Sequence, residues 1–159
     1  MKNKPLVGAF FCFAFLWGPA GCPAGPTDKA LIPKPRTLAA VITIDQNNTC
    51  AQDVGGILTA FPDLRALESG GFAGDTIEWK GKDAKGNDAT VVVKFPAKTP
   101  NGNAGTPFSS NGTPAFTFTS GQNSGPASNA ILGDFSFESV TVGGAKCSNG
   151  TFGGVHVTK

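Results

Sequence analysis

The sequence predicts an all-β protein, a Greek-key β-sandwich of about seven strands. Glycine and proline supply 22 and 12 of the 159 residues, about a fifth of the chain against roughly 12% in an average protein. Charged residues make up only 15%, and the apolar residues stand in short runs between turn signals. This composition excludes a long-helix bundle or a coiled coil and is typical of many short strands.

The first 21 residues have the layout of a secretory signal peptide. Lys2 and Lys4 precede an apolar run at residues 6–17, and small or helix-breaking residues follow it. At about 1.5 Å per residue, the run is too short to span about 30 Å of hydrocarbon. The sequence therefore predicts that residues 1–21 direct export.

The cleavage site has two alternatives. Cleavage after Ala20 gives a secreted protein. Residues 19–22 instead resemble a bacterial lipobox, in which Cys22 becomes the lipidated first residue, although Pro19 stands where leucine is usual. Secretion and a periplasmic or cell-surface lipoprotein therefore both remain open. Residues 22–36 are rich in proline and are expected to form an extended tether to a domain at residues 37–159.

The mature chain is expected to be close to neutral. Removal of Lys2 and Lys4 with the signal peptide leaves 11 basic against 11 acidic residues. Nothing in this balance attracts DNA, RNA or anionic lipid. We expect no nucleic-acid partner, and membrane attachment only through a lipid on Cys22.

The first half of the domain is expected to hold three strands. Residues 38–44 are a β-branched apolar run, and residues 54–61 are a second apolar stretch. Residues 61–67 fit either a short helix or an extended segment, because proline and aspartate favour a first helical turn. Residues 76–80 alternate between apolar and polar side chains, as in a half-buried strand.

The second half is expected to hold four strands. Residues 89–95 follow a polar hairpin turn, and residues 115–119 follow a long loop of glycine, proline, asparagine and serine. Residues 135–142 and 152–157 complete the set. The alternation assigns these side chains to the core: Ile77, Trp79, Val91, Val93, Phe116, Phe118, Phe135 and Phe137.

The cysteines predict one disulfide. Cys12 leaves with the signal peptide, whereas Cys50 and Cys147 remain in the body of the domain. Two body cysteines in an exported protein most often pair, and a loop of this length is assigned about 4–5 kcal/mol of stabilisation by the chain-entropy model. The alternative is a metal or nucleophile site that uses Cys147.

Several motifs resemble, in the same order, those of the cupredoxin family. Gly74–Trp79 is similar to the turn and strand that carry the buried tryptophan of that sandwich. Thr90–Phe95 and Gly133–Phe137 are similar to later strands, and Gly144–Cys147 stands where the copper-ligand loop begins. The resemblance implies a cupredoxin-like or immunoglobulin-like sandwich over residues 40–158.

The chain departs from the cupredoxin ligand set. A blue-copper site needs two histidines, one thiolate and usually a weak methionine ligand. This chain has only His156, nine residues after Cys147, and no methionine after Met1. It is therefore similar to cupredoxin-like domains that keep the sandwich without the metal, in which Cys50 and Cys147 bridge an early strand to a late one. We expect no metal and no cofactor.

The remaining candidate residues favour structural roles. His156 is expected on the solvent side of the last strand, without a second ligand or a serine elbow motif. Asp134 and Glu138 are expected to share one face of one strand about 13 Å apart, too far for paired acid–base chemistry. An exposed aromatic patch is an alternative to core packing for four phenylalanines: Phe61, Phe72, Phe108 and Phe152.

These observations predict a non-catalytic, exported binding or structural module of the cell envelope or the extracellular space. Its partner there is not identified by the sequence. The alternatives are a degenerate copper-binding or electron-transfer protein, which requires a metal signal after copper is added, and a secreted hydrolase, which requires a catalytic triad that the sequence does not supply.

Overall fold

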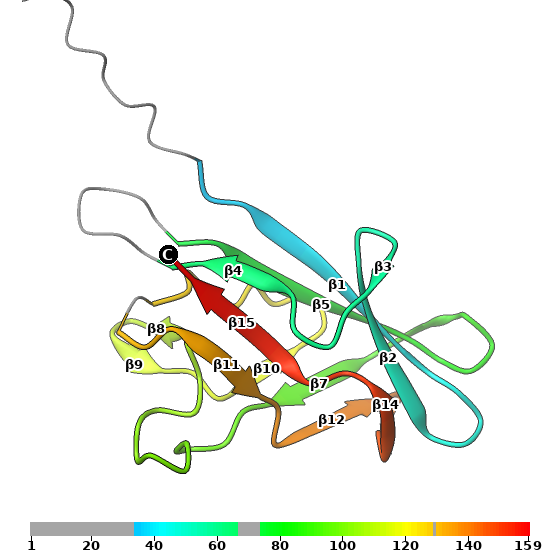
Figure 1. The fold of residues 1–159 in the computed structure, drawn as a ribbon. Helices are drawn as coiled ribbons and strands as arrows, with labels where there is room; N and C mark the ends of the chain where they lie inside the picture. The colour runs from blue at the N-terminus through cyan, green and yellow to red at the C-terminus, as the bar shows by residue number, and fades with distance from the viewer. Residues whose placement is uncertain (1–33, 67–73, 129) are drawn as a thin grey trace, which may run out of the picture. The chain divides into compact units, whose positions relative to one another are not determined.

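The computed structural model describes residues 34–66, 74–128 and 130–159, which form strands and turns without a helix (Figure 1). The predicted signal peptide, Cys22 and most of the predicted tether lie outside these residues. Within the described residues, no helix is long and apolar enough to cross a membrane. The strands are β1 (Thr37–Ile44), β2 (Thr49–Val54), β3 (Ile57–Leu58), β4 (Asp63–Arg65), β5 (Thr76–Lys82), β6 (Asp88–Ala89), β7 (Val91–Lys94), β8 (Ser109–Ser110), β9 (Thr113–Pro114), β10 (Thr117–Thr119), β11 (Gly133–Ser136), β12 (Ser139–Val142), β13 (Ala145–Lys146), β14 (Asn149–Thr151) and β15 (Gly154–Thr158).

A mixed sheet of six strands is built around β1. Its order is β14-β2-β1-β5-β6, with β3 paired to β2. Strand β1 is antiparallel to β2 and parallel to β5. Its Ala40, Ile42 and Ile44 are buried while the residues between them are more exposed, so this predicted apolar run alternates and packs one face against the core.

Two further sheets and a hairpin complete the domain. Strands β10-β7-β12-β13 form an antiparallel sheet, β11-β15-β4 form a mixed one, and β8 pairs with β9. The all-β fold class is confirmed, and the arrangement is consistent with a β-sandwich. The Greek-key connection remains a prediction.

The described strands are shorter and more numerous than the seven expected. Short strands such as β8, β9, β13 and β14 lie outside the predicted runs, and two predicted runs each serve two sheets. The run at 89–95 is divided at Thr90, so that β6 joins the six-stranded sheet and β7 joins the antiparallel one. The run at 135–142 is divided in the same way into β11 and β12. Strands that bend from one sheet into the next form the corners of such folds.

Residues 63–65 are extended and not helical. Strand β4 pairs in parallel with β15, so that Leu64 lies beside Val157. This pairing supplies the backbone hydrogen bonds that a single helical turn would leave unmade. Of the two predicted alternatives for residues 61–67, the extended one is therefore correct for the residues described, and the helix is wrong.

Trp79 lies at the centre of the core and is only 1% exposed. Its ring contacts those of Phe95, Phe108, Phe118 and Phe137, with centroids 5.5–6.3 Å apart. Most of these contacts are edge-to-face, the arrangement that aromatic pairs prefer. Of the eight predicted core residues, six are buried; Phe116 and Phe137 are half-buried and pack against the core.

A buried glutamine completes the environment of Trp79. The indole Nε1 donates to Gln52 Oε1 at 3.2 Å. The Gln52 amide nitrogen lies within 3.3–3.4 Å of the carbonyl oxygens of Thr59, Ala60 and Gly154. Gln52 is fully buried, and its amide is paired at both ends, as a polar group in a core requires.

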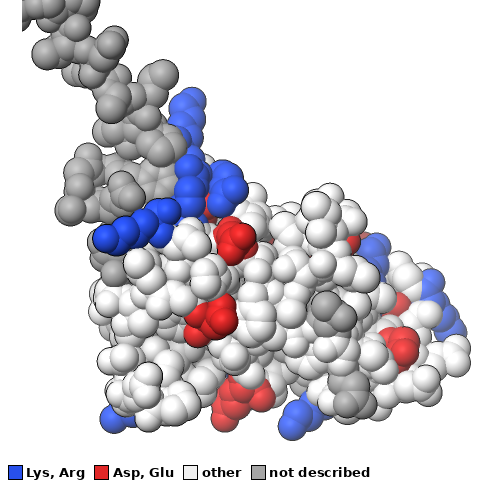
Figure 2. Space-filling view, in the orientation of Figure 1, with Lys and Arg blue, Asp and Glu red and all other residues white. Residues whose placement is uncertain are grey.

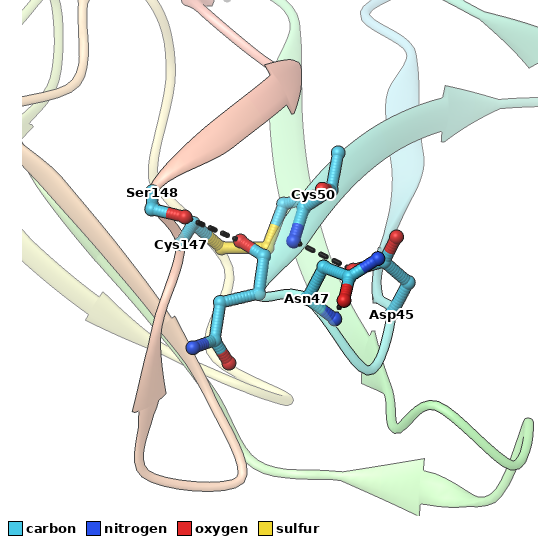
Figure 3. Close-up of a disulfide and its surroundings, with 7 residues drawn as sticks. Asp45, Asn47, Cys50, Cys147 and Ser148 are labelled. Carbon is cyan, nitrogen blue, oxygen red and sulfur yellow. Dashed lines mark hydrogen bonds between the residues drawn. A yellow bond between two sulfur atoms is a disulfide. The ribbon is translucent and has the colours of Figure 1, made fainter.

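Cys50 and Cys147 form a disulfide across 97 residues of sequence (Figure 3). The following strand, β14, then runs parallel to β2, with Gly150 beside Cys50. A Cβ atom at Gly150 would lie 1.7 Å from the Cys50 carbonyl oxygen, so only glycine fits there. The predicted disulfide is present, and it fixes the edge of the six-stranded sheet.

We expect Trp79→Ala to lower the free energy of unfolding by about 3–5 kcal/mol, because it empties the centre of the aromatic cluster. Urea denaturation measures the change. As a control, Trp79→Phe keeps a ring but leaves Gln52 Oε1 unpaired, at a smaller cost of about 1–3 kcal/mol. Trp79 is the only tryptophan after Trp17, so long-wavelength emission of the mature protein with ready iodide quenching would contradict its burial.

Replacement of both Cys50 and Cys147 by alanine is expected to lower stability by about 2–5 kcal/mol, because the unfolded chain loses its cross-link. Urea denaturation with and without reductant measures this, and reductant should affect only the natural protein. Two reactive body thiols in the denatured, unreduced mature protein would show that the bond does not form.

Candidate functional site

A cleft of about 430 Å³ lies beside strand β10, at the edge of the antiparallel sheet. Its walls come from the β8–β9 hairpin, from β10 and from the loop that follows β10. Among the described residues, none of those that line it is ionisable. They are Ser109, Ser110, Ala115, Thr117, Phe118, Gln122, Asn123, Ser124 and Gly125.

The hairpin wall follows directly from the local sequence. Asn111 and Gly112 both have positive φ angles, 50° and 78°, and they connect β8 to β9 as the two central residues of a tight hairpin. An Asn-Gly pair is strongly preferred at these positions because both residues tolerate the left-handed region. The turn leaves the two serines of β8 exposed at the cleft.

The loop wall is anchored to strand β5. Ser124 and Ile77 bond twice: the Ser124 N–H donates to the Ile77 carbonyl, and the Ile77 N–H donates to Ser124 Oγ, both at 2.9 Å. The Asn123 side chain donates to Thr76 Oγ1 at 3.0 Å. Ser124 is buried, so this side of the cleft is held by the core sheet.

Strand β10 presents part of its backbone to the cleft. Phe116, Phe118 and Ser120 face β7 with their backbone groups, as shown by the bonds Phe95 N–H to Phe116 O and Ser120 N–H to Val91 O. By the alternation of an antiparallel ladder, the N–H and C=O of Thr117 point to the free edge. No hydrogen bond joins them to another described residue.

Gln122 is fixed next to Thr119. Its N–H donates to the Thr119 carbonyl at 3.0 Å, and its side-chain Oε1 accepts the Thr119 N–H at 2.9 Å. The amide nitrogen at the other end of the side chain has no partner among the described residues. The cleft therefore combines fixed amide and backbone groups with hydroxyl groups, an arrangement suited to binding by hydrogen bonds.

A second groove, of about 380 Å³, lies beside the β2–β3 hairpin. It is lined in part by Leu38, Val54 and Phe61. At the hairpin, Ile57 and Leu58 are 70% and 63% exposed. Two large apolar side chains are therefore exposed beside this groove, which Arg36 and Asp63 also line.

Asp75 is a buried carboxylate shared by two arginines. Its oxygens accept hydrogen bonds from the side chains of Arg36 and Arg65 at 2.6–3.1 Å, and from their backbone N–H groups at 2.7 and 3.0 Å. Figure 2 shows basic side chains gathered near the start of the described chain. Arg36, assigned by the sequence to the tether, is thus bonded to the folded domain.

Opposing effects set the protonation of Asp75. Burial by itself raises the pKa of the carboxyl, but the hydrogen bonds from Arg65 and Arg36, side chain and backbone, outweigh it. The pKa is therefore held well below its usual range, and Asp75 is charged. The role of this network is structural, because it ties the start of β1 to the end of β4 and the start of β5.

His156 is bonded to Asp134. Its Nδ1 lies 2.5 Å from Asp134 Oδ1, and the side chains are 37% and 61% exposed. In the sheet β11-β15-β4, His156 stands between Asp134 and Asp63. His156 was expected on the solvent side of the last strand; its side chain is only partly exposed, and its bond to Asp134 was not expected.

The expectation that Asp134 and Glu138 share one strand is wrong. Asp134 belongs to β11, whereas Glu138 lies between β11 and β12 and donates its N–H to the Lys94 carbonyl. The chain passes from one sheet to another between them. Their spacing along a continuous strand therefore does not apply.

The aromatic candidates do not form one surface. Phe108 is 1% exposed in the Trp79 cluster, and Phe61 and Phe152 are half-buried. Phe72 lies outside the described residues, as does the candidate lipidation site Cys22. Phe118, predicted as core, is buried and also forms part of the cleft floor.

Cys147 carries no free thiolate, because its sulfur is bonded to that of Cys50. In the part of the chain that the structure describes, no three side chains of histidine, cysteine, aspartate or glutamate come together as a metal site. The residues present therefore do not fit the ligand set of a blue-copper centre.

Neither the cleft nor the Asp75 network was predicted from the sequence. One signal was available for the cleft: the alternation at residues 115–119 places Thr117 outward, and Asn111-Gly112 predicts the hairpin opposite it. Asp75 looks like an ordinary turn residue in the sequence. Nothing local indicates that two distant arginines will bury it.

Comparison of the chain with protein-family models, with curated proteins and with solved structures finds no match.

We expect Asp75→Asn to lower the stability at pH 7 by about 3 kcal/mol, because two arginines lose the charge between them. The natural protein should also lose stability as the pH falls below about 4, since the unfolded carboxyl then takes up a proton more readily than the folded one. The variant should show a flatter dependence in that range. Thermal unfolding between about pH 2 and pH 7 measures both effects.

The matched control is Asp88→Asn, which removes a carboxylate from an exposed pair with Lys82. It should change stability little, because exposed ion pairs contribute little. An Asp75→Asn protein as stable as the natural one would contradict a structural role for the buried network.

Proposed function

We propose that this chain is a non-catalytic, exported binding or structural module of the cell envelope or the extracellular space. The cleft beside β10 is the observation that carries the proposal. Its described lining offers hydroxyl, amide and backbone groups held in place by hydrogen bonds to β5 and β10. Such groups bind a ligand, whereas acid–base or nucleophilic catalysis requires a base beside a nucleophile.

The disulfide supports the exported location. Disulfides persist in oxidising compartments and are rare in the cytosol. Cys50 and Cys147 are both buried in the core, where the bond contributes to stability. Together with the signal-like residues 1–21, it favours a protein that works outside the cytosol.

The alternative of a degenerate copper protein is less favoured. It needs Cys147 as a thiolate, and the bond to Cys50 removes that ligand. The resemblance of residues 40–158 to cupredoxins then concerns the fold alone. We propose a cupredoxin-like domain without a type 1 copper site.

The experiment is an intact-mass measurement on the protein from its native host. We expect a chain that lacks the signal peptide and has lost two hydrogens at the disulfide. The natural protein and a Cys22→Ser variant are compared after separation of membranes from soluble fractions. A lipid on Cys22 adds the mass of its acyl chains and keeps the natural protein, but not Cys22→Ser, in the membrane fraction. If Cys22 carries no lipid, the natural protein and Cys22→Ser distribute alike between the two fractions.

The binding role is tested with isolated cell envelopes of the same host. The mature protein should be retained by this material and should release no soluble fragments from it. A full-length chain in the cytosol would contradict the export, and steady release of fragments would contradict the absence of catalysis.

A further inference from the structure

We propose that the cleft beside β10 binds a neutral, polyhydroxylated ligand, namely a segment of an uncharged polysaccharide. This inference rests on the proposed function and names its ligand class. The cleft carries no ionisable side chain among its described residues. Its described lining is serine, threonine, glutamine and asparagine with two apolar residues and a glycine, so an ionic ligand would give up its hydration without meeting an opposite charge.

The polar groups that face the cleft are both donors and acceptors. The Gln122 amide nitrogen and the Thr117 N–H donate, the Thr117 carbonyl accepts, and the hydroxyl groups of Ser109 and Ser110 do either. A sugar hydroxyl is likewise a donor and an acceptor. A row of such hydroxyl groups therefore matches this mixed surface, whereas a purely donating or accepting ligand would satisfy only part of it.

The amide of Gln122 is held in place before any ligand arrives. Its Oε1 is occupied by the Thr119 N–H, which leaves the amide nitrogen as the group offered to a ligand. The side chain thus loses little further freedom on binding, and that loss is a major cost of forming a polar contact.

An apolar floor accompanies these groups. Phe118 is 5% exposed and, with Ala115, contributes to the lining of the cleft. Sugar rings carry C–H faces between their hydroxyl groups, and these faces pack against apolar surface. The floor and the polar rim together fit a ring that has both characters.

The geometry of β10 disfavours an extended peptide as the ligand. Strand addition needs a row of free backbone groups along an edge. Here the Ala115 N–H donates to the Phe108 carbonyl on one side, and Gln122 occupies both the N–H and C=O of Thr119 on the other. Only Thr117 is left between them, too short an edge for a strand.

The test is a titration of the mature protein with hexa-N-acetylchitohexaose, cellohexaose and maltohexaose, three uncharged oligosaccharides, followed by amide NMR shifts. We expect at least one of them, at millimolar concentration, to shift the resonances of Ser109, Thr117 and Gln122. The uncharged peptide acetyl-Ser-Val-Ser-Val-Ser-amide serves as the competing ligand class and should shift none of them.

Two variants assign the binding to the cleft. Gln122→Glu keeps an oxygen for the Thr119 N–H but replaces the free donor with an acceptor. Thr117→Val removes one hydroxyl group at constant shape. Each is expected to weaken the binding about three- to tenfold, the effect of one neutral hydrogen bond. The controls Gln46→Glu and Thr43→Val change exposed residues of the six-stranded sheet and its first turn, and should leave the affinity unchanged.

Three outcomes would overturn the proposal: no shift with any oligosaccharide, shifts outside the cleft only, or binding of the peptide in place of the sugars. Thermal unfolding of each variant verifies that it is folded. If Gln122→Glu does not fold, Thr117→Val alone tests the proposal. If cell envelopes retain the mature protein but the oligosaccharide titration gives no binding, the polysaccharide is rejected as the ligand class. The proposed binding function would still stand.

Discussion

The position of Trp79 sets how the three main sheets lie against one another. The residue belongs to β5 of the six-stranded sheet, and its ring meets Phe118 of the antiparallel sheet. Its indole N–H donates to Gln52, whose amide reaches the Gly154 carbonyl in the third sheet. One side chain thus connects all three sheets, by apolar contact on one side and by a satisfied polar relay on the other.

Much of this core could be predicted from the sequence, because alternation is a local property. Residues 76–80 show it clearly, and Ile77 and Trp79 are both buried as expected. The division of the run at 89–95 could not be predicted in the same way. Alternation describes which face a side chain occupies, but the sheet that a strand joins depends on partners far away in the chain.

The cleft and the buried carboxylate show the same limit. The structural role of Asp75 comes from its hydrogen bonds with Arg36 and Arg65, which lie 39 and 10 residues before it in the sequence. Thr117 matters because of the groups on either side of it along the same edge. The Ala115 N–H and the N–H and C=O of Thr119 are hydrogen-bonded, whereas the N–H and C=O of Thr117 have no partner among the described residues. These features depend on which hydrogen-bonding groups are paired and which are left unpaired once the chain has folded. The sequence shows only that the groups are present.

The Cys50–Cys147 bond has a consequence for the durability of the domain. It closes a covalent ring that contains β3 to β13, with β1 and β15 outside it. Residues 100–103 are exposed within that ring, and a protease that cuts the chain there leaves both pieces joined through sulfur. Separation then needs a second cut or a reductant, so a nicked molecule remains a single covalent body as long as the disulfide is intact.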